Sequence, residues 1–240
     1  MSDKKTPVRG EADFGDFGKW FENFWYHYKA QTIIAAVAII TLIICAVQFV
    51  GREVSDYYVM YAGPQVLMLQ DITYMEAAIC EVGEDVDGNG KVSVALEDIV
   101  MLSPEEQKEA ESAGAVLNGQ FLQTSMKEYE QQIFGGDAMV CLLSPYMYEI
   151  VHAANGFVPL SEIFDKMPES AYDECSVVLA KTDFGEYFNG INDLPEDTLI
   201  CVRRLSSMAQ FKGIKKTEAA HAANVALFRA MVEFEAPEKE

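Results

Sequence analysis

The chain has 240 residues, half of them hydrophobic, and a formal net charge of −20 at pH 7. Residues 1–29 carry five basic and five acidic groups, so the excess negative charge belongs to residues 30–240. Such an acidic surface repels phosphate backbones and anionic lipid headgroups, and we therefore expect no nucleic-acid partner.

The first strong feature is an apolar run, Ile33–Val50, in which only Thr41 and Gln48 are polar. A helix rises 1.5 Å per residue, so this run nearly crosses a hydrocarbon core of about 30 Å. We expect residues 30–51 to form a transmembrane helix that holds the protein in the lipid bilayer. The run is longer than a signal-peptide core and no A-x-A site follows it, which favours an uncleaved anchor over a cleaved signal peptide or a lipid-modified Cys45.

The distribution of basic residues predicts the orientation of this helix. Five basic residues precede the run, whereas only Arg52 lies just after it. Basic residues favour the cytoplasmic side. We therefore expect a single-pass protein of the cell membrane with residues 1–29 in the cytoplasm, an extracytoplasmic domain over residues 52–235, and a frayed tail over 236–240.

Aromatic residues recur at helical spacing just before the span. They are Phe14, Phe17, Trp20, Phe21, Phe24, Trp25 and Tyr28. Such rings favour the headgroup layer of a membrane. The pattern predicts an interfacial helix over Phe14–Lys29 that lies on the inner leaflet and leads into the span. The alternative is a helix that docks the helix of a partner.

Strand-like and helix-like segments alternate through the outer domain, which predicts an α/β layered domain with a mainly parallel sheet. We expect strands over Tyr57–Ala62, Lys91–Val100, Ala138–Leu143, Ser176–Ala180 and Thr198–Val202. We expect helices over Val66–Val82, through Leu122, Met126, Tyr129 and Ile133 up to Gly135-Gly136, from Ser144 to about Ala154, and over Thr217–Phe234. Ser103-Pro104-Glu105-Glu106 is a capping box that opens an exposed helix or loop.

Four cysteines lie in the outer domain: Cys80, Cys141, Cys175 and Cys201. They allow three disulfide pairings in an oxidising compartment. Each sits in or beside an apolar stretch, where a free thiol packs as a small hydrophobe, and this favours buried thiols over disulfides. The spacing of the Cys and His residues matches no metal-binding motif.

Asp85-Val86-Asp87-Gly88-Asn89-Gly90-Lys91 matches the first half of an EF-hand calcium loop. Asp85, Asp87, Asn89 and the Lys91 carbonyl are the candidate ligands, but position 12 is Leu96 where a bidentate Glu is needed. The favoured alternative is a type I′ hairpin at Asn89-Gly90 that leads into the following strand. We therefore predict no bound metal and no other cofactor, and calcium is the single candidate.

Catalytic motifs are missing from the outer domain. It has two histidines, His152 and His221, and no nucleophile turn of the G-x-S-x-G type or phosphate loop. We expect a protein that is not an enzyme, with an uncharacterised extracytoplasmic enzyme as a remaining alternative.

The segment Gly135–Ile163 reads GGDAMVCLLSPYMYEIVHAANGFVPLSEI. It resembles a stretch of the extracellular solute-binding proteins of bacterial ABC importers, in which a G-x-x-D turn, an apolar strand and a helix precede G-x-[LF]-x-P-L. The aromatic helix, the span and the D-x-D-G-N-G-K-V-x-V turn also resemble a group of small membrane-anchored bacterial proteins of unassigned function. The resemblance implies a fold like one lobe of a periplasmic binding protein.

In the family that the chain resembles, ligands touch the loops after the first and third strands. These loops correspond here to Gly63-Pro64 and to Ser144-Pro145-Tyr146, which makes Gly63, Pro64, Ser144 and Tyr146 the candidate ligand-binding residues. A full binding protein closes two lobes on its solute, and this chain has room for about one. We expect a non-enzymatic binding or scaffold module that contacts another envelope protein or forms a homodimer, with a solute- or calcium-binding protein as the alternative.

Overall fold

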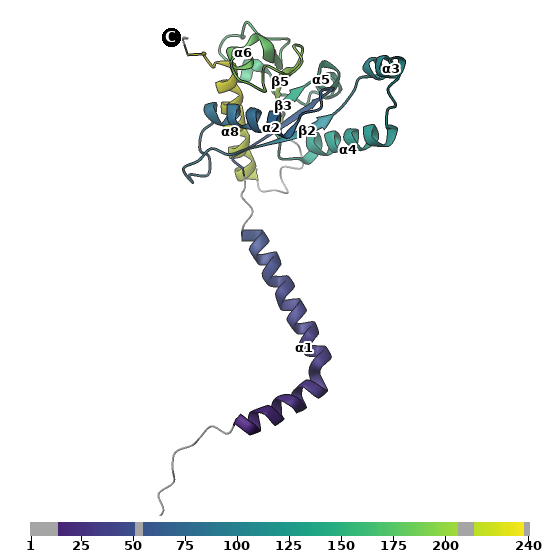
Figure 1. Cartoon of the computed structure of the whole chain (residues 1–240). Coiled ribbons are helices and arrows are strands. Elements are labelled where there is room, and N and C mark those ends of the chain that lie inside the picture. The colour runs from purple at the N-terminus through teal and green to yellow at the C-terminus, as the bar shows by residue number, and fades with distance from the viewer. Residues whose placement is uncertain (1–13, 51–54, 206–213, 238–240) are drawn as a thin grey trace, which may run out of the picture. The chain divides into compact units, whose positions relative to one another are not determined.

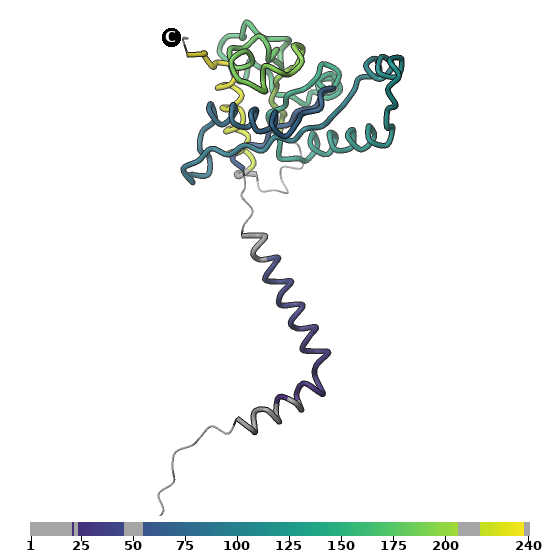
Figure 2. The backbone as a smooth tube through the Cα atoms, viewed as in Figure 1, coloured from purple at the N-terminus to yellow at the C-terminus, as the bar shows by residue number. Residues whose placement is uncertain are grey.

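The computed structural model describes residues 14–50, 55–205 and 214–237, with the side chains of residues 21, 24–45, 55–205 and 217–237. The chain divides into two compact units, Met1–Val54 and Ser55–Glu240. Figure 1 shows the elements of each unit, and Figure 2 traces the backbone through them. The two units are described separately below.

The first unit contains one long helix, α1 (Phe14–Val50), of 37 residues. Its section Phe24–Cys45 is long and apolar enough to cross a membrane. Aromatic rings pair along its first half, with Phe21 stacked on Trp25 and Phe24 beside Tyr28. The expected apolar helix is therefore present. Lys4, Lys5, Arg9 and Arg52, on which the predicted orientation depends, lie outside the described residues.

The second unit is built on one sheet, which has five strands among the described residues in the order β2-β1-β3-β5-β4. The strands are β1 (Tyr57–Gly63), β2 (Val94–Val100), β3 (Val140–Leu143), β4 (Ser176–Val178) and β5 (Leu199–Val202). Both β2 and β3 run parallel to β1. Because β5 is antiparallel to both β3 and β4, four strands run in one direction and β5 alone is reversed. The mainly parallel sheet expected from the sequence is confirmed.

Helices cover both faces of this sheet. On one face, Val59 and Tyr61 of β1 pack in a core with α2 (Leu69–Val82) and α8 (Ile214–Val232). On the other face, Met60 and Ala62 pack with Tyr129 of α4 (Gly119–Gly135) and with α5 (Pro145–His152). The side chains of a strand alternate between its two faces, so β1 contributes to both cores. The result is a helix–sheet–helix arrangement.

The remaining elements are short. Helix α3 (Pro104–Ser112) precedes α4, and η1 (Leu160–Glu162), η2 (Leu179–Lys181) and α6 (Asp183–Tyr187) surround β4. After α8, Ala236 donates its backbone N–H to the Asp183 carboxylate at 3.3 Å. Residues 238–240, the end of the predicted tail, lie outside the described residues.

Local sequence signals account for several helix boundaries. The Ser103 backbone N–H donates to Glu106 Oε2 at 2.6 Å, and the Glu106 N–H donates to Ser103 Oγ at 3.2 Å, which confirms the predicted capping box. Helix α4 ends at the predicted glycine pair, with Gly136 as its C-cap. Helix α2 begins three residues later than predicted, at Leu69, where the Asp71 carboxylate accepts from the Met68 N–H at 2.8 Å.

All five cysteines are free thiols. Cys141, Cys175 and Cys201 are buried, and Cys80 is half-buried. The thiol interpretation of the outer cysteines is thus confirmed. Burial is the largest cause of the raised pKa values of Cys175 and Cys201.

Candidate functional site

The two predicted ligand loops lie side by side at the carboxyl edge of the sheet. Ala62 of β1 pairs with Leu143 of β3, and the Ser144 backbone N–H donates to the Ala62 carbonyl at 2.9 Å. The chain passes from β1 to β2 on one side and then crosses back to β3 on the other, so β1 and β3 flank a topological switch point. Open α/β sheets bind their ligands at such points. The structure therefore brings Gly63, Pro64 and Ser144 together where the predicted fold requires.

The fourth predicted residue follows Ser144 by two positions. Tyr146, in the first turn of α5, packs against the core cluster that contains α4. Ser144 is the N-cap of α5 and accepts from the Met147 N–H at 3.5 Å. Tyr146 therefore has a packing role, and its side chain is partly buried.

Apolar side chains are exposed beside the switch point. In the segment that joins β1 to α2, Val66, Met68 and Leu69 are 66%, 67% and 80% exposed, whereas Leu67 is buried. The segment is held by the Gln65 N–H, which donates to Tyr61 Oη at 3.2 Å. A Cβ at Gly63 would lie 2.6 Å from the same oxygen, so this turn requires glycine. We refer to Val66, Met68 and Leu69 as the apolar edge.

The acidic loop between α2 and β2 is organised by carboxylates. Asp85 accepts from the backbone N–H groups of Gly88, Asn89 and Gly90 at 2.7–3.2 Å. Asp56, just before β1, accepts from the N–H groups of Val86, Asp87 and Ser93 at 2.9–3.1 Å. Burial alone would raise the pKa of Asp56, but these bonds and the Ser93 hydroxyl lower it overall. Carboxylate oxygens of Asp56, Asp85 and Asp87 lie within 4.8 Å of one another.

The predicted hairpin at Asn89-Gly90 is wrong. The strand that follows, β2, is at the edge of the sheet and pairs in parallel with β1, so it has no antiparallel partner among the described residues. A type I′ turn needs a positive φ at both central residues. Gly90 has φ +87°, but Asn89 does not have a positive φ. Asn89 instead bonds to its neighbours, with Oδ1 accepting from the Lys91 N–H at 2.8 Å.

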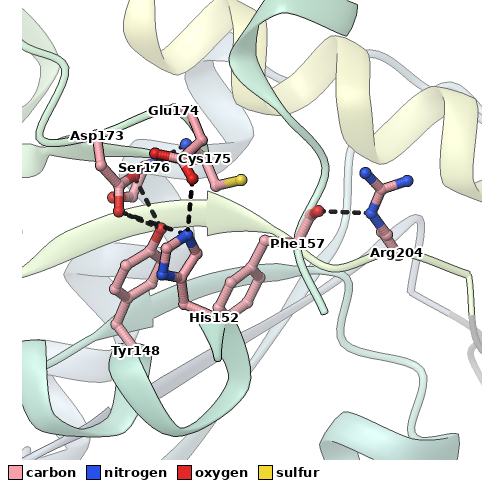
Figure 3. Close-up of polar contacts among 8 residues, drawn as sticks. All are labelled: Tyr148, His152, Phe157, Asp173, Glu174, Cys175, Ser176 and Arg204. Carbon is pink, nitrogen blue, oxygen red and sulfur yellow. Dashed lines mark hydrogen bonds and ion pairs between the residues drawn. The ribbon is translucent and has the colours of Figure 1, made fainter. Parts of the chain in front are cut away.

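The sequence analysis missed a polar cluster at the end of α5. Tyr148 Oη donates to the Asp173 carboxylate, with distances of 2.8 and 2.7 Å to its two oxygens. Asp173 also accepts from the backbone N–H groups of Cys175 and Ser176, both at 2.9 Å. His152 Nε2 lies 3.3 Å from Glu174 Oε1 and 3.8 Å from Asp173 Oδ2. Figure 3 shows these side chains meeting from α5 and from the loop before β4.

Stacked rings fix the geometry of this cluster. The Tyr148 ring is stacked 5.0 Å from His152 and 5.0 Å from Phe157. Burial, as the largest cause, raises the pKa of Tyr148, so its hydroxyl stays protonated and donates. Burial also tends to raise the pKa of Asp173, but bonds from Cys175, Tyr148 and Ser176 and the nearby His152 lower it overall. Asp173 is thus an ionised acceptor held by several donors.

A pocket of about 400 Å³ lies between α4, α5 and the segment after β5. Arg203 and Arg204 line it, together with exposed Phe134 and Ile150. The Arg203 guanidinium is buried and donates to the carbonyls of Ile133 and Gly136 at the end of α4. These two groups therefore serve the fold, whereas the buried Nε has no hydrogen-bond partner among the described residues, and burial lowers the pKa of Arg203.

Comparisons with protein-family models, curated proteins and solved structures returned no match to this chain.

Proposed function

We propose that this chain is a membrane-anchored, non-enzymatic binding module whose α/β domain lies outside the cell membrane and contacts another protein of the envelope. The observation that carries the proposal is the apolar edge beside the switch point of the sheet.

The apolar section of α1 supports the anchor, because it is long enough to cross the hydrocarbon core. The predicted orientation puts the domain that begins at Ser55 outside the cytoplasm. A domain tethered in this way encounters other envelope proteins readily, since the domain and those proteins are confined to the space next to the membrane.

The apolar edge supports a protein partner. Val66, Met68 and Leu69 expose most of their surface, although ordinary folding would favour their burial. Neighbouring exposed apolar side chains mark sites of protein interaction. The edge lies next to Gly63, Pro64 and Ser144, where α/β folds bind their ligands.

The resemblance to one lobe of a solute-binding protein fits the same proposal. Residues 55–240 form a single compact unit around one sheet. One lobe offers an open edge and only half of the cage that encloses a solute. A protein partner, or a second copy of the chain, would cover this edge.

The test is site-specific photo-crosslinking of the full chain in the cells that make it. A photoreactive residue replaces Leu69 in one variant and Val116, in the turn between α3 and α4, in a control. Val116 is an equally apolar residue and is 98% exposed. We expect a discrete crosslinked envelope protein with the first variant and not with the second.

Two results would decide against the proposal. Identical products from the two positions would mean that the apolar edge does not bind a specific envelope protein. No product at Leu69, followed by none at Val66, would mean that the edge is not covered by protein. A product of twice the chain's own mass would assign the edge to a homodimer.

Calcium binding is a second candidate, favoured by the carboxylate of Asp56, which joins Asp85 and Asp87 in the acidic loop. The sequence motif did not include this third carboxylate. We expect calcium to raise the melting temperature of the purified chain and Asp87→Asn to abolish the rise. An equal rise in the variant would exclude this loop.

A further inference from the structure

Three different metal-ligating side chains meet beside α5. A ring nitrogen of His152, a carboxylate oxygen of Glu174 and Cys175 Sγ lie within 4.8 Å of one another. His152 comes from the last turn of α5, whereas Glu174 and Cys175 come from the loop that enters β4. In Figure 3 the Glu174 carboxylate faces the His152 ring, and Cys175 lies next to Glu174 on the same loop. Glu174 and Cys175 lie more than twenty positions from His152 in the sequence, so no short sequence motif indicates the cluster.

The chemistry of the donors selects one class of metal. Imidazole, thiolate and carboxylate are the three ligand types that Zn²⁺ takes in proteins. Calcium and magnesium prefer oxygen ligands alone, so a buried sulfur donor disfavours them. The cluster therefore differs in kind from the acidic loop of Asp56, Asp85 and Asp87, where the side-chain donors are carboxylate oxygens.

The spacing of the donors suits a small tetrahedral ion. With Zn–N and Zn–O bonds of about 2.0–2.2 Å, a tetrahedron places these two atoms about 3.3–3.5 Å apart. His152 Nε2 and Glu174 Oε1 are separated by 3.3 Å. The Glu174 side chain is 67% exposed and the His152 side chain 26% exposed, so both can adjust towards an ion from solvent. Cys175 is buried and would supply the inner ligand.

Neighbouring side chains hold the ligands in place. Tyr148 stacks on the imidazole of His152 and at the same time donates to Asp173. Asp173 in turn accepts from the Cys175 backbone N–H, which fixes the loop that carries Glu174 and Cys175. Such supporting contacts orient the ligands of metal sites. Asp173 Oδ2, 3.8 Å from His152 Nε2, or a water molecule would complete the coordination.

We propose that His152, Glu174 and Cys175 form a site for a zinc-class divalent cation, which ties the end of α5 to the loop before β4. The ion would lie at the surface with its sulfur ligand buried, and it would join two segments that are distant in the sequence. This inference does not rest on the proposed contact with an envelope protein.

The experiment is a titration of the full chain, purified in detergent and stripped with EDTA, with Co²⁺ as a spectroscopic probe of zinc sites. We expect one Co²⁺ per chain, a near-ultraviolet cobalt–thiolate band, and displacement of cobalt by Zn²⁺. Cys175→Ala should remove the band, and His152→Gln should weaken binding by about tenfold or more. Cys80→Ala, a half-buried cysteine elsewhere in the domain, is the matched control and should leave both unchanged.

Each alternative outcome overturns the site. No thiolate band with the wild-type chain, or a band that persists in Cys175→Ala, would exclude the Cys175 thiolate as a ligand. Unchanged affinity in His152→Gln, whose folding is checked by circular dichroism, would mean that His152 and Glu174 form an ion pair only. Cobalt binding that shows no thiolate band and that is lost in Asp85→Asn would place the metal in the acidic loop.

Discussion

At the scale of single residues, Asp173 organises the end of α5. It accepts from the Tyr148 hydroxyl, from the backbone of Cys175 and Ser176, and from the Ser176 hydroxyl. Each donor compensates part of the cost of keeping a largely buried carboxylate ionised. The hydrogen bonds of the cluster therefore support one another, and the substitution of one residue should weaken the contacts of the others.

Tyr148→Phe should destabilise the domain without a change in packing volume. The substitution removes one bond to an ionised acceptor, and we expect the free energy of unfolding to fall by about 1–2 kcal/mol. Urea unfolding followed by near-ultraviolet circular dichroism measures it, because both tryptophans lie outside this domain. Tyr172→Phe, at a 51% exposed tyrosine, is the control. Equal losses in the two variants would contradict a special role for the Tyr148 hydroxyl.

The same carboxylate predicts a dependence of stability on pH. The folded-state pKa of Asp173 is lowered, so its contribution is present above the unfolded pKa of about 3.9 and is lost as pH falls through the folded value. We expect Asp173→Asn to reduce the loss of stability between about pH 5 and pH 3. A residual slope should remain, because Asp56 also has a lowered pKa. An unchanged slope in Asp173→Asn would refute the prediction.

At the scale of elements, one arginine joins two layers of the fold. Arg203, just after β5, donates to the Ile133 and Gly136 carbonyls at the end of α4. The last carbonyls of a helix lack partners within it, and a basic side chain satisfies them. The Arg203 carbonyl in turn contacts His221 Nε2 of α8 at 3.0 Å. This residue therefore links β5 to helices on both faces of the sheet.

Arg203→Met should remove the side-chain link to α4 and leave two carbonyls without their donor, while the backbone contact with His221 stays. We expect a loss of about 2–4 kcal/mol in the free energy of unfolding, measured by thermal or urea denaturation. Arg204→Met is the matched control, since its partly exposed guanidinium donates to Phe157 and pairs with Glu162 at the surface. We expect that variant to lose about 1 kcal/mol or less. A larger loss in Arg204→Met would reverse this interpretation.

The elements were predictable from the sequence where local signals agreed. The capping box at Ser103, the glycine pair after α4 and the apolar run of β3 each correspond to an observed boundary or strand. The acidic loop shows the limit, because Asn89-Gly90 has the same local appearance in a hairpin and in a loop. Its conformation depends on Asp56, which lies about thirty positions earlier and which no local pattern includes.

The candidate site was predictable to the same degree. The resemblance to solute-binding proteins selects the loops of Gly63-Pro64 and Ser144, and the parallel pairing of β1 with β3 places these loops at one edge of the sheet. The cluster of Tyr148, His152 and Asp173 did not follow, because it depends on β4 joining the edge of the sheet through antiparallel pairing with β5, a strand that comes later in the chain. Only the tertiary pairing brings residues 173–176 beside α5.

At the scale of the whole molecule, the described part of the protein consists of one apolar helix and one α/β domain. Every proposed partner, whether protein or cation, depends on which side of the membrane this domain occupies. The side is predicted from basic residues, most of which lie outside the described part of the chain. The orientation is therefore the central claim to test.

The most direct measurement is labelling of single cysteines in intact cells with a membrane-impermeant maleimide. Cys45 and Cys80, the two cysteines that are not buried, are first replaced by serine. Glu111→Cys then adds an exposed thiol in α3, and Ser2→Cys adds one before the span, in separate variants. The account predicts that Glu111→Cys is labelled in intact cells and Ser2→Cys only after lysis. Labelling of Ser2→Cys alone in intact cells would contradict it and place the α/β domain in the cytoplasm.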